Sequence, residues 1–242
     1  MRWMARLAAL AAVLAGCAAP QQTTPLRQPP PPAQQPAPDF RTAARTFVAV
    51  VERVKPVAER TCRERRPDLN CTFRIVIDDR AGAPPNAFQT LDPATGQPLI
   101  GFTLSLIADA RNADELAFAL GHEAAHHIAG HIPRARDTAM AGALILGAIA
   151  ALGGADDRAI RSAQDMGAAV GARSYSRDFE LEADALGTVI AFRAGFDPER
   201  GAGFFDRLPD PGNRFLGSHP PNAWRVGVVA RTTADLRSGR RR

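Results

Sequence analysis

The sequence predicts an α+β fold that is mostly helical and contains one small sheet. Runs of residues suited to strands are confined to residues 73–104, whereas apolar residues recur at helical spacing over most of the rest. About 200 residues follow a segment rich in Pro and Gln, which is enough for one compact domain with its own core. No internal repeat is evident in that length.

The helices and strands are placed by their end signals. Asn112 followed by acidic residues begins one helix and Gly130 ends it, and Ser176 and Gly195 bracket a later helix in the same way. Two strands are joined by the turn sequence Asp92-Pro93-Ala94-Thr95-Gly96. We predict helices at 40–61, 112–130, 138–150, 156–171, 177–194, 198–207 and 220–236, and strands at 73–78, 86–91 and 98–104.

The 98–104 strand is predicted to lie at an edge of the sheet. Gly101, Thr103 and Ser105 fall on one face of it, and small or polar residues suit a fully buried strand poorly. An edge strand could hold an extended peptide through backbone hydrogen bonds. An ordinary half-buried strand is the alternative.

The stretch His122-Glu123-Ala124-Ala125-His126 is the most informative part of the sequence. Residues four apart on a helix share a face, so the two imidazoles can reach one metal ion. Glu123 points about 100° round the helix, toward the water that would attack a substrate. This spacing is typical of zinc peptidases, in which zinc is the Lewis acid and the glutamate is the general base. A surface helix with two unrelated histidines is the alternative.

Catalytic zinc usually has three protein ligands, so the sequence should hold a third. His131 is near, but it falls one position short of the H-E-x-x-H-x-x-G-x-x-H spacing. Glu180 and Asp184 share one face of the 177–194 helix, in an apolar run where inward-facing acids would need a cation. One could bind zinc while the other accepts the free N–H of a ligating histidine. Glu182 is expected to face solvent, and a wholly solvated acidic face is the alternative.

The pairing of H-E-x-x-H with E-x-E-A-D-x-x-G about fifty residues later resembles the zinc metallopeptidases of family forty-eight, which includes the CAAX prenyl endopeptidases. The similarity covers roughly residues 40–236. Further matching elements are Asn86-Ala87-Phe88, Tyr175-Ser176-Arg177, and Ser218-His219-Pro220-Pro221 with Arg225. The resemblance implies a zincin-like metallopeptidase domain, one zinc ion per chain and polypeptide substrates.

The resemblance also implies roles for single residues. It assigns His122, His126 and Glu180 as zinc ligands, Glu123 as the base and Asp184 as the acid that orients a ligand. It further places His219 near the metal. There His219 could donate to the oxyanion as charge develops, or it could occupy the open metal position and keep the enzyme latent. A backbone hydrogen bond on a Pro-fixed loop is the structural alternative.

The N-terminus predicts export and lipidation. A short cationic start and an apolar run lead into Leu14-Ala15-Gly16-Cys17, which reads as a bacterial lipobox with a lipid on the Cys17 thiol. Ala18, rather than Asp, favours the outer membrane, and an ordinary signal peptide is the alternative. The predicted organisation is a signal peptide at 1–16, the lipidated cysteine with a Pro/Gln-rich tether at 17–39, the peptidase domain at 40–236 and a basic tail at 237–242.

The charge pattern argues against nucleic acid as a partner. The formal net charge is +5, and removal of residues 1–16 takes away Arg2 and Arg6 but no acid, which leaves +3. The remaining arginines are dispersed, apart from three at the end of the tail. An exported protein would also not meet nucleic acid.

Two cysteines remain once Cys17 is lipidated, and both would then lie in an oxidising compartment. We predict that Cys62 and Cys71 form a disulfide that ties the end of the first helix to the first strand. Metal ligation is the alternative, but no histidine is near them in the sequence.

Residues 139–155 form an uncharged stretch rich in Ala and Gly. We predict a helix that is packed or covers the active site, because 17 residues fall just short of a comfortable membrane span. A segment that dips into a membrane is the alternative. If exposed, its leucines and isoleucines would form an apolar patch suited to unfolded or membrane protein substrates.

Taken together, the sequence predicts a lipid-anchored zinc endopeptidase on the periplasmic side of the outer membrane. Misfolded or envelope proteins are the expected substrates, and the resemblance adds outer-membrane protein assembly factors as partners. A zinc-containing chaperone without proteolytic activity is one alternative, although the intact Glu123 counts against it. An amidase of cell-wall peptides is the other.

Overall fold

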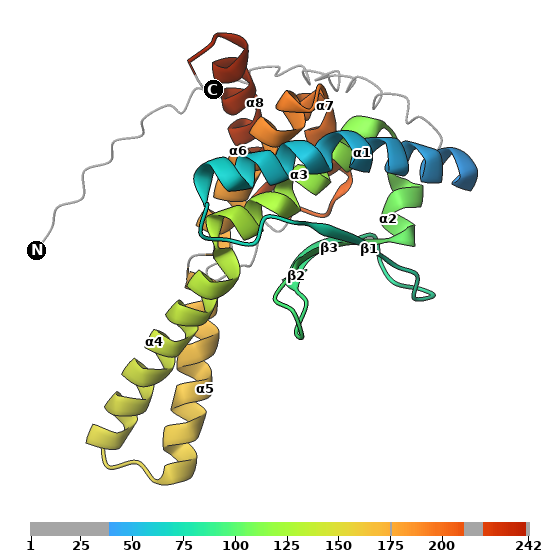
Figure 1. The fold of residues 1–242 in the computed structure, drawn as a ribbon. Helices are drawn as coiled ribbons and strands as arrows, with labels where there is room; N and C mark the ends of the chain where they lie inside the picture. The colour runs from blue at the N-terminus through green and yellow to red at the C-terminus, as the bar shows by residue number, and fades with distance from the viewer. Residues whose placement is uncertain (1–38, 175, 211–219, 241–242) are drawn as a thin grey trace, which may run out of the picture. The chain divides into compact units, whose positions relative to one another are not determined.

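The computed structural model of the protein describes residues 39–174, 176–210 and 220–240. The predicted α+β fold with helices in the majority is confirmed (Figure 1). The elements in chain order are α1 (Phe40–Arg65), β1 (Arg74–Asp78), β2 (Ala87–Leu91), β3 (Pro98–Thr103), α2 (Leu104–Asp109), α3 (Ala113–Ala129), α4 (His131–Leu152), α5 (Asp157–Ser174), α6 (Ser176–Arg193), α7 (Pro198–Ala202), the 3-10 helix η1 (Gly203–Arg207) and α8 (Asn222–Arg237).

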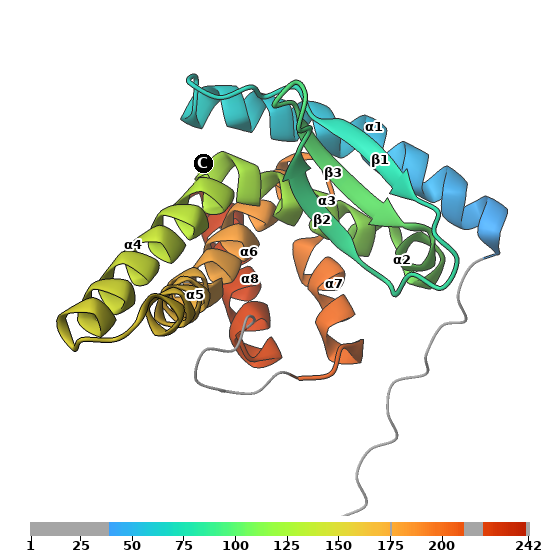
Figure 2. The same ribbon diagram turned by 90° about the horizontal axis from the view of Figure 1, so that it is seen from below.

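The sheet has the strand order β1-β3-β2, with β3 parallel to β1 and antiparallel to β2. Figure 2 shows β1 on the side of α1 and β2 at the opposite edge, toward α6 and α7. The prediction that 98–104 is an edge strand is therefore wrong, because β3 is the central strand and five of its six residues are buried. The described edge strand nearest to α3 is β2.

The small and polar residues of β3 have local explanations. Gly101 lies opposite Phe88 of β2, and a Cβ at Gly101 would overlap the ring of Phe88. The hydroxyl of Thr103 accepts a hydrogen bond of 2.9 Å from the backbone N–H of Asn86. The hydroxyl of Ser105, which lies in α2, donates to the carbonyl of Ala83 at 2.7 Å. These residues therefore indicate close packing against the chain before and within β2, and not exposure.

The core lies where α1, α3, α6 and the sheet meet. The ring of Phe47 on α1 packs edge-on against the ring of Phe102 on β3, with centroids 5.0 Å apart. Val54 of α1 and Leu120 of α3 are fully enclosed in the same cluster. This packing fixes α3, which carries the H-E-x-x-H motif, between the sheet and α6.

The backbones of α3 and α6 touch at two glycines. A Cβ on Gly121 would lie 2.7 Å from the carbonyl oxygen of Gly187, and a Cβ on Gly187 would lie 2.7 Å from the backbone nitrogen of His122. Any side chain at either position would force the two helices apart. The contact brings His122 next to the helix that carries the acidic motif.

The predicted disulfide between Cys62 and Cys71 is present, with Cα atoms 5.6 Å apart. Both cysteines are buried. The bond joins the end of α1 to the chain before β1, and closing so short a loop stabilises the fold by about 2–3 kcal/mol in the chain-entropy model.

The helix predicted at 138–150 begins earlier, at His131. Gly130 has φ 69° and ends α3 in the left-handed conformation, and it is also the N-cap of α4, so no connecting segment is needed. Pro133 lies in the first turn of α4, where the missing N–H removes no hydrogen bond. The short α2 was not predicted, and the side chain of Thr103 caps it by accepting from the N–H of Leu106.

Helices α4 and α5 pack chiefly against each other and extend together away from α3 (Figure 1). The prediction that 139–155 is packed into the domain or covers the site is wrong, because the outer side of α4 is exposed. Within the described part of the chain, α4 alone is long and apolar enough to cross a membrane by length and composition.

Candidate metal site

Three side chains from two helices meet next to the Gly121–Gly187 contact. His122 and His126 come from successive turns of α3, and Glu180 comes from the first turns of α6. Their ligand atoms all lie within 4.8 Å of one another. The Nε2 atoms of the two imidazoles are 3.0 Å apart, and the Glu180 carboxylate lies 3.6 Å from His122 Nε2 and 3.4 Å from His126 Nε2. This cluster can hold a metal ion.

Asp184 and Arg225 support His122 from the side opposite to the cluster. Asp184 is fully buried, and its Oδ1 lies 2.9 Å from Nδ1 of His122. Arg225 on α8 donates to both oxygens of Asp184, from Nε at 2.8 Å and from Nη2 at 2.7 Å, and its guanidinium lies over the ring of Phe205. Loss of either partner would leave a buried charge uncompensated, at a cost of about 3–5 kcal/mol.

His131 stands in the same relation to His126. Its Nδ1 lies 2.8 Å from Nδ1 of His126, and its Nε2 lies 3.2 Å from the Glu182 carboxylate. The ring stacks on Phe179 with centroids 4.6 Å apart, and Glu182 also accepts from Arg134 at 2.8 Å. Burial lowers the pKa of His131 to about 4, so the neutral ring can accept the Nδ1–H of His126. His131 is thus a neighbour of the cluster and not a member of it.

The described part of the site is rich in carboxylates. Glu123, Glu180 and Asp184 all contribute one, and the guanidinium of Arg225 lies 2.7 Å from Asp184 and 3.5 Å from Glu180. Burial would lower the pKa of His122, but its hydrogen bonds with Asp184 and Glu180 raise that pKa to about 10. Both observations indicate that this environment stabilises added positive charge, such as that of a divalent cation.

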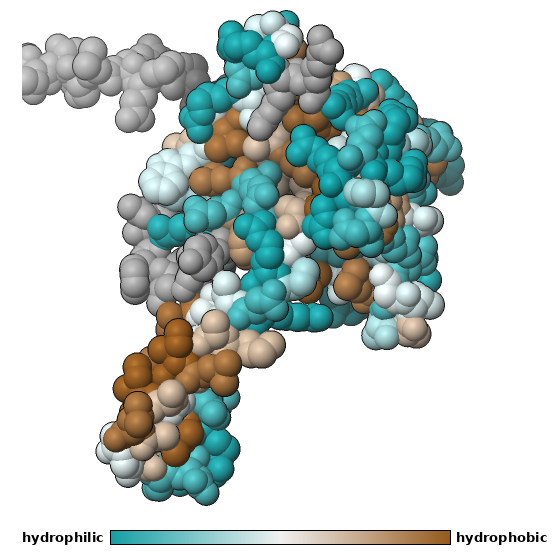
Figure 3. Space-filling view, turned by 60° about the vertical axis from the view of Figure 1, so that its left-hand side comes forward, coloured by the Kyte–Doolittle hydropathy of each residue, from teal (hydrophilic) through white to brown (hydrophobic). Residues whose placement is uncertain are grey.

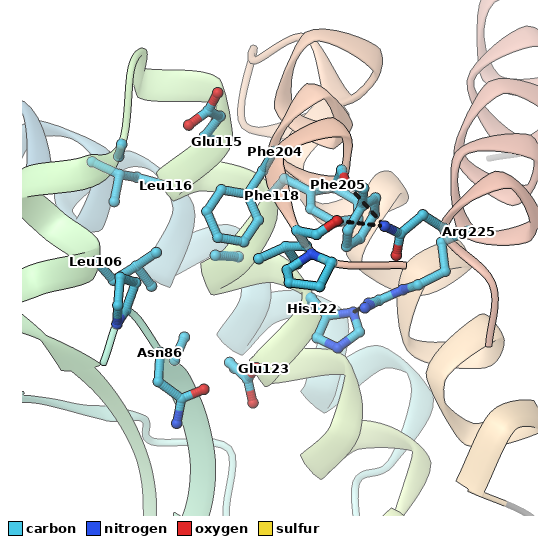
Figure 4. Close-up of a pocket in the computed structure, with 17 residues that line it drawn as sticks. Asn86, Leu106, Glu115, Leu116, Phe118, His122, Glu123, Phe204, Phe205 and Arg225 are labelled. Atoms are coloured by element: carbon cyan, nitrogen blue, oxygen red, sulfur yellow. Dashed lines mark hydrogen bonds between the residues drawn. The ribbon is translucent and has the colours of Figure 1, made fainter. Parts of the chain in front are cut away.

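Glu123 faces a pocket of about 300 Å³ beside the cluster (Figure 4). Figure 4 shows His122 and Glu123 at one wall, with Arg225 pointing toward His122. Most of the lining is apolar, with contributions from Leu106, Leu116, Phe118, Phe204 and Phe205. Burial raises the pKa of Glu123, while the nearby histidines oppose that shift.

Strand β2 runs alongside both halves of the site. Asn86 and Ala87 line the pocket that Glu123 faces, and Gln89 and Leu91 line a second pocket of about 230 Å³ beside His126. In the described sheet β2 pairs only with β3, which leaves its other edge without a partner strand. An extended segment could add to that edge next to the cluster.

The sequence anticipated some of these neighbours and missed others. Glu182 is half exposed, as expected, whereas Glu180 lies in the cluster. The sequence did not indicate the contact of His131 with His126, because α4 begins seven residues earlier than the helix predicted at 138–150. Arg225 was noted only as part of a motif. Cys17 and His219 lie outside the described residues.

Comparison with known proteins gives two findings. The sequence model described as "Peptidase family M48" matches residues 49–233. The chain is also 32% identical, over 126 residues, to a protein of Vibrio cholerae serotype O1 named putative beta-barrel assembly-enhancing protease. That alignment covers 48% of this chain and 25% of the relative, so the chain matches about a quarter of the relative's length.

Proposed function

Because the chain belongs to peptidase family M48 and is therefore a metallopeptidase, we propose that it is a zinc-dependent endopeptidase whose zinc is held by His122, His126 and Glu180. The observation that supports this most directly is the meeting of these three side chains, with Glu123 in the adjoining pocket. Two imidazoles and one carboxylate are a known catalytic zinc set, which leaves a fourth position open. The carboxylates gathered among the described residues of the site fit a divalent cation.

Residues next to the cluster would orient the two histidines that bind the metal. Asp184 accepts the Nδ1–H of His122 and His131 accepts the Nδ1–H of His126, so each ring turns its Nε2 toward the cluster. Such partners fix the tautomer and the orientation of a ligating histidine. The tautomers follow from the hydrogen-bond network. Arg225 holds Asp184 in place and keeps it ionised.

Glu123 would serve as general base and then as general acid. His122, His126 and Glu180 would hold the zinc ion, which would supply Lewis acidity toward the scissile carbonyl and the attacking water. Glu123 takes a proton from the attacking water and passes it to the leaving amine. A carboxyl whose pKa is raised by burial suits a group that must both accept and return a proton.

The free edge of β2 is the proposed binding site for the substrate backbone. This edge is proposed in place of β3, because both edges of β3 are already paired with other strands. A peptide added to β2 would pass from the pocket at Glu123 to the second pocket at His126, because residues of β2 line both. Backbone hydrogen bonds at this edge would bind many sequences, and the apolar pocket would favour a hydrophobic side chain.

We also propose that the protein acts on misfolded or envelope proteins from the periplasmic side of the outer membrane. The name of the Vibrio cholerae relative supports this location and suggests outer-membrane protein assembly factors as partners. The lipobox at Cys17 supports a lipid anchor. The signal peptide at 1–16 and the tether at 17–39 belong to the same proposal.

Casein hydrolysis tests the proposed chemistry. The purified protein should cleave casein, a chelator should abolish the cleavage, and added zinc should restore it. Zinc binding without turnover would instead favour the chaperone alternative. Cleavage of peptidoglycan fragments with casein left intact would favour the amidase alternative.

Replacing Cys17 by alanine should abolish incorporation of a fatty-acid label during growth. The wild-type chain should take up the label and fractionate with the outer membrane. The variant should take up none, because the acceptor thiol is lost, and the fold should be unaffected. Equal labelling of the two chains would contradict lipidation at Cys17.

A further inference from the structure

The hairpin formed by α4 and α5, residues 131–174, turns its large apolar side chains outward. Five of these side chains lie on α4, and their exposed fractions run from 59% to 90%. The five residues are Met140, Leu144, Ile145, Ile149 and Leu152. Figure 3 shows brown, hydrophobic atoms along one side of the hairpin and teal, hydrophilic atoms toward the other. No charged residue interrupts α4 after Asp137.

Glycines form the closest contacts between α4 and α5 on the inner side of the hairpin. A Cβ on Gly142 of α4 would overlap the carbonyl oxygen of Gly167 on α5. A Cβ on Gly171 would overlap the carbonyl oxygen of Thr138, and Gly147 is buried against the side chain of Gln164. The two backbones therefore lie in close contact, as is common between helices in membranes, where small residues form the interface.

This arrangement is the reverse of what water favours. A helical hairpin that is stable in water buries its large apolar side chains between the helices and exposes polar ones. Here glycines form the closest contacts between the two helices, and five large apolar side chains of α4 are exposed. The outer face of α4 is therefore suited to an apolar environment.

The charges of α5 limit how the hairpin can meet that environment. Asp157, Arg158, Arg161 and Asp165 are exposed on α5, and Asp156 lies in the turn. A full crossing of the hydrocarbon would bury these charges at high cost. A helix pair with one apolar and one charged face fits instead at the boundary between acyl chains and headgroups.

We propose that the hairpin docks on a lipid bilayer, with the outer face of α4 in the interface and the charged face of α5 toward water. A protein partner would be expected to find hydrogen-bonding side chains on this face, since interfaces between proteins carry about one hydrogen bond per 100–200 Å². The five exposed side chains of α4 offer none. Docking would hold the peptidase at the membrane surface independently of any lipid on Cys17.

Fluorescent labelling of single cysteines tests the docking and its orientation. In the full chain with Cys17→Ser, an environment-sensitive NBD group is attached at Ile145→Cys, at Arg161→Cys or at Val48→Cys, an exposed control on α1. The Cys62–Cys71 disulfide is kept closed by omitting reductant. Vesicles of phosphatidylcholine and phosphatidylglycerol should shift the emission at 145 to the blue, and spin-labelled acyl chains should quench it. The labels at 161 and 48 should change little.

Three results would overturn the proposal. An emission at 145 that ignores vesicles would exclude docking. A shift at 145 that appears without vesicles and grows with protein concentration would show that a second copy covers the face. An equal response at 161 would contradict the orientation, because α5 would then be immersed as well.

A paired substitution gives a second test that does not depend on labels. Leu144→Ser with Ile149→Ser should lower vesicle partitioning by roughly tenfold for each side chain. Val48→Ser should leave partitioning unchanged. Circular dichroism and casein hydrolysis in solution check that the paired variant is folded. Partitioning should be the same in a Glu123→Gln background, so failure of the docking and failure of the proposed peptidase activity are distinguishable.

Discussion

Replacement of Glu123 by glutamine is expected to lower casein hydrolysis by roughly 10²- to 10⁴-fold while a full equivalent of zinc stays bound. Glutamine has nearly the shape of glutamate but cannot accept the proton of the attacking water. The three proposed ligands are untouched, so metal content should not change. Steady-state kinetics and metal analysis on the same preparation measure both quantities.

Glu182→Gln is the matched control for this experiment. Glu182 lies on α6 near the site, but its carboxylate contacts His131 and Arg134 and is half exposed. Its loss should leave most of the activity. If Glu123→Gln loses zinc together with activity, Glu123 is part of the metal shell and its role as base is wrong.

Replacement of Glu180 by alanine is expected to empty the metal site. Removing a ligand should weaken zinc binding by more than the roughly 10- to 100-fold that follows from losing an outer hydrogen-bond partner. His131→Ala should stay within that smaller loss, because His131 contacts the Nδ1 of His126 and not the cluster. The zinc content of each variant is measured after dialysis against a series of chelators of increasing zinc affinity, which separates a large loss of affinity from a small one.

The reverse pattern would assign His131 as the third ligand in place of Glu180. Similar zinc loss in both variants would contradict this assignment, because Glu180 contributes a ligand atom to the cluster and His131 contacts only the Nδ1 of His126.

Asp184→Asn provides an intermediate reference. Its amide can still contact Nδ1 of His122, but the charge that Arg225 pairs with is gone.

The helix from Ala113 to Ala129 and the approach of His122 to His126 could be predicted because both depend on residues close in sequence. The cap at Asn112 and the stop at Gly130 are equally local. The cost of burying an acid without a cation placed both Glu180 and Asp184 near the histidines, and the family resemblance assigned Glu180 as the ligand. The structure brings these three side chains together.

The strand order could not be predicted from the same kind of signal. The small and polar residues Gly101 and Thr103 predict an edge strand, but their neighbours are Phe88 and Asn86, which come from an earlier strand and loop. The pairing of strands depends on contacts between residues far apart in the sequence, which a local pattern does not reveal. The choice between edge and centre therefore needed the structure.

The contacts of Arg225 and His131 were missed for a similar reason. Arg225 meets Asp184 from a helix that follows it by about forty residues in the chain. His131 turns back toward His126 only because Gly130 reverses the chain at once into α4. In both cases the amino-acid type was visible in the sequence, whereas the direction of the side chain was not.

The contact between Gly121 and Gly187 sets the distance between α3 and α6 directly at the candidate metal site. The α4–α5 hairpin lies between those helices in sequence, and its first turn reaches the site, where His131 contacts His126 and Arg134 contacts Glu182. Insertions or deletions beyond that first turn should leave the candidate ligands where they are. The fold therefore separates the candidate metal site from the far end of the hairpin, which can be lengthened, shortened or replaced without rebuilding the site.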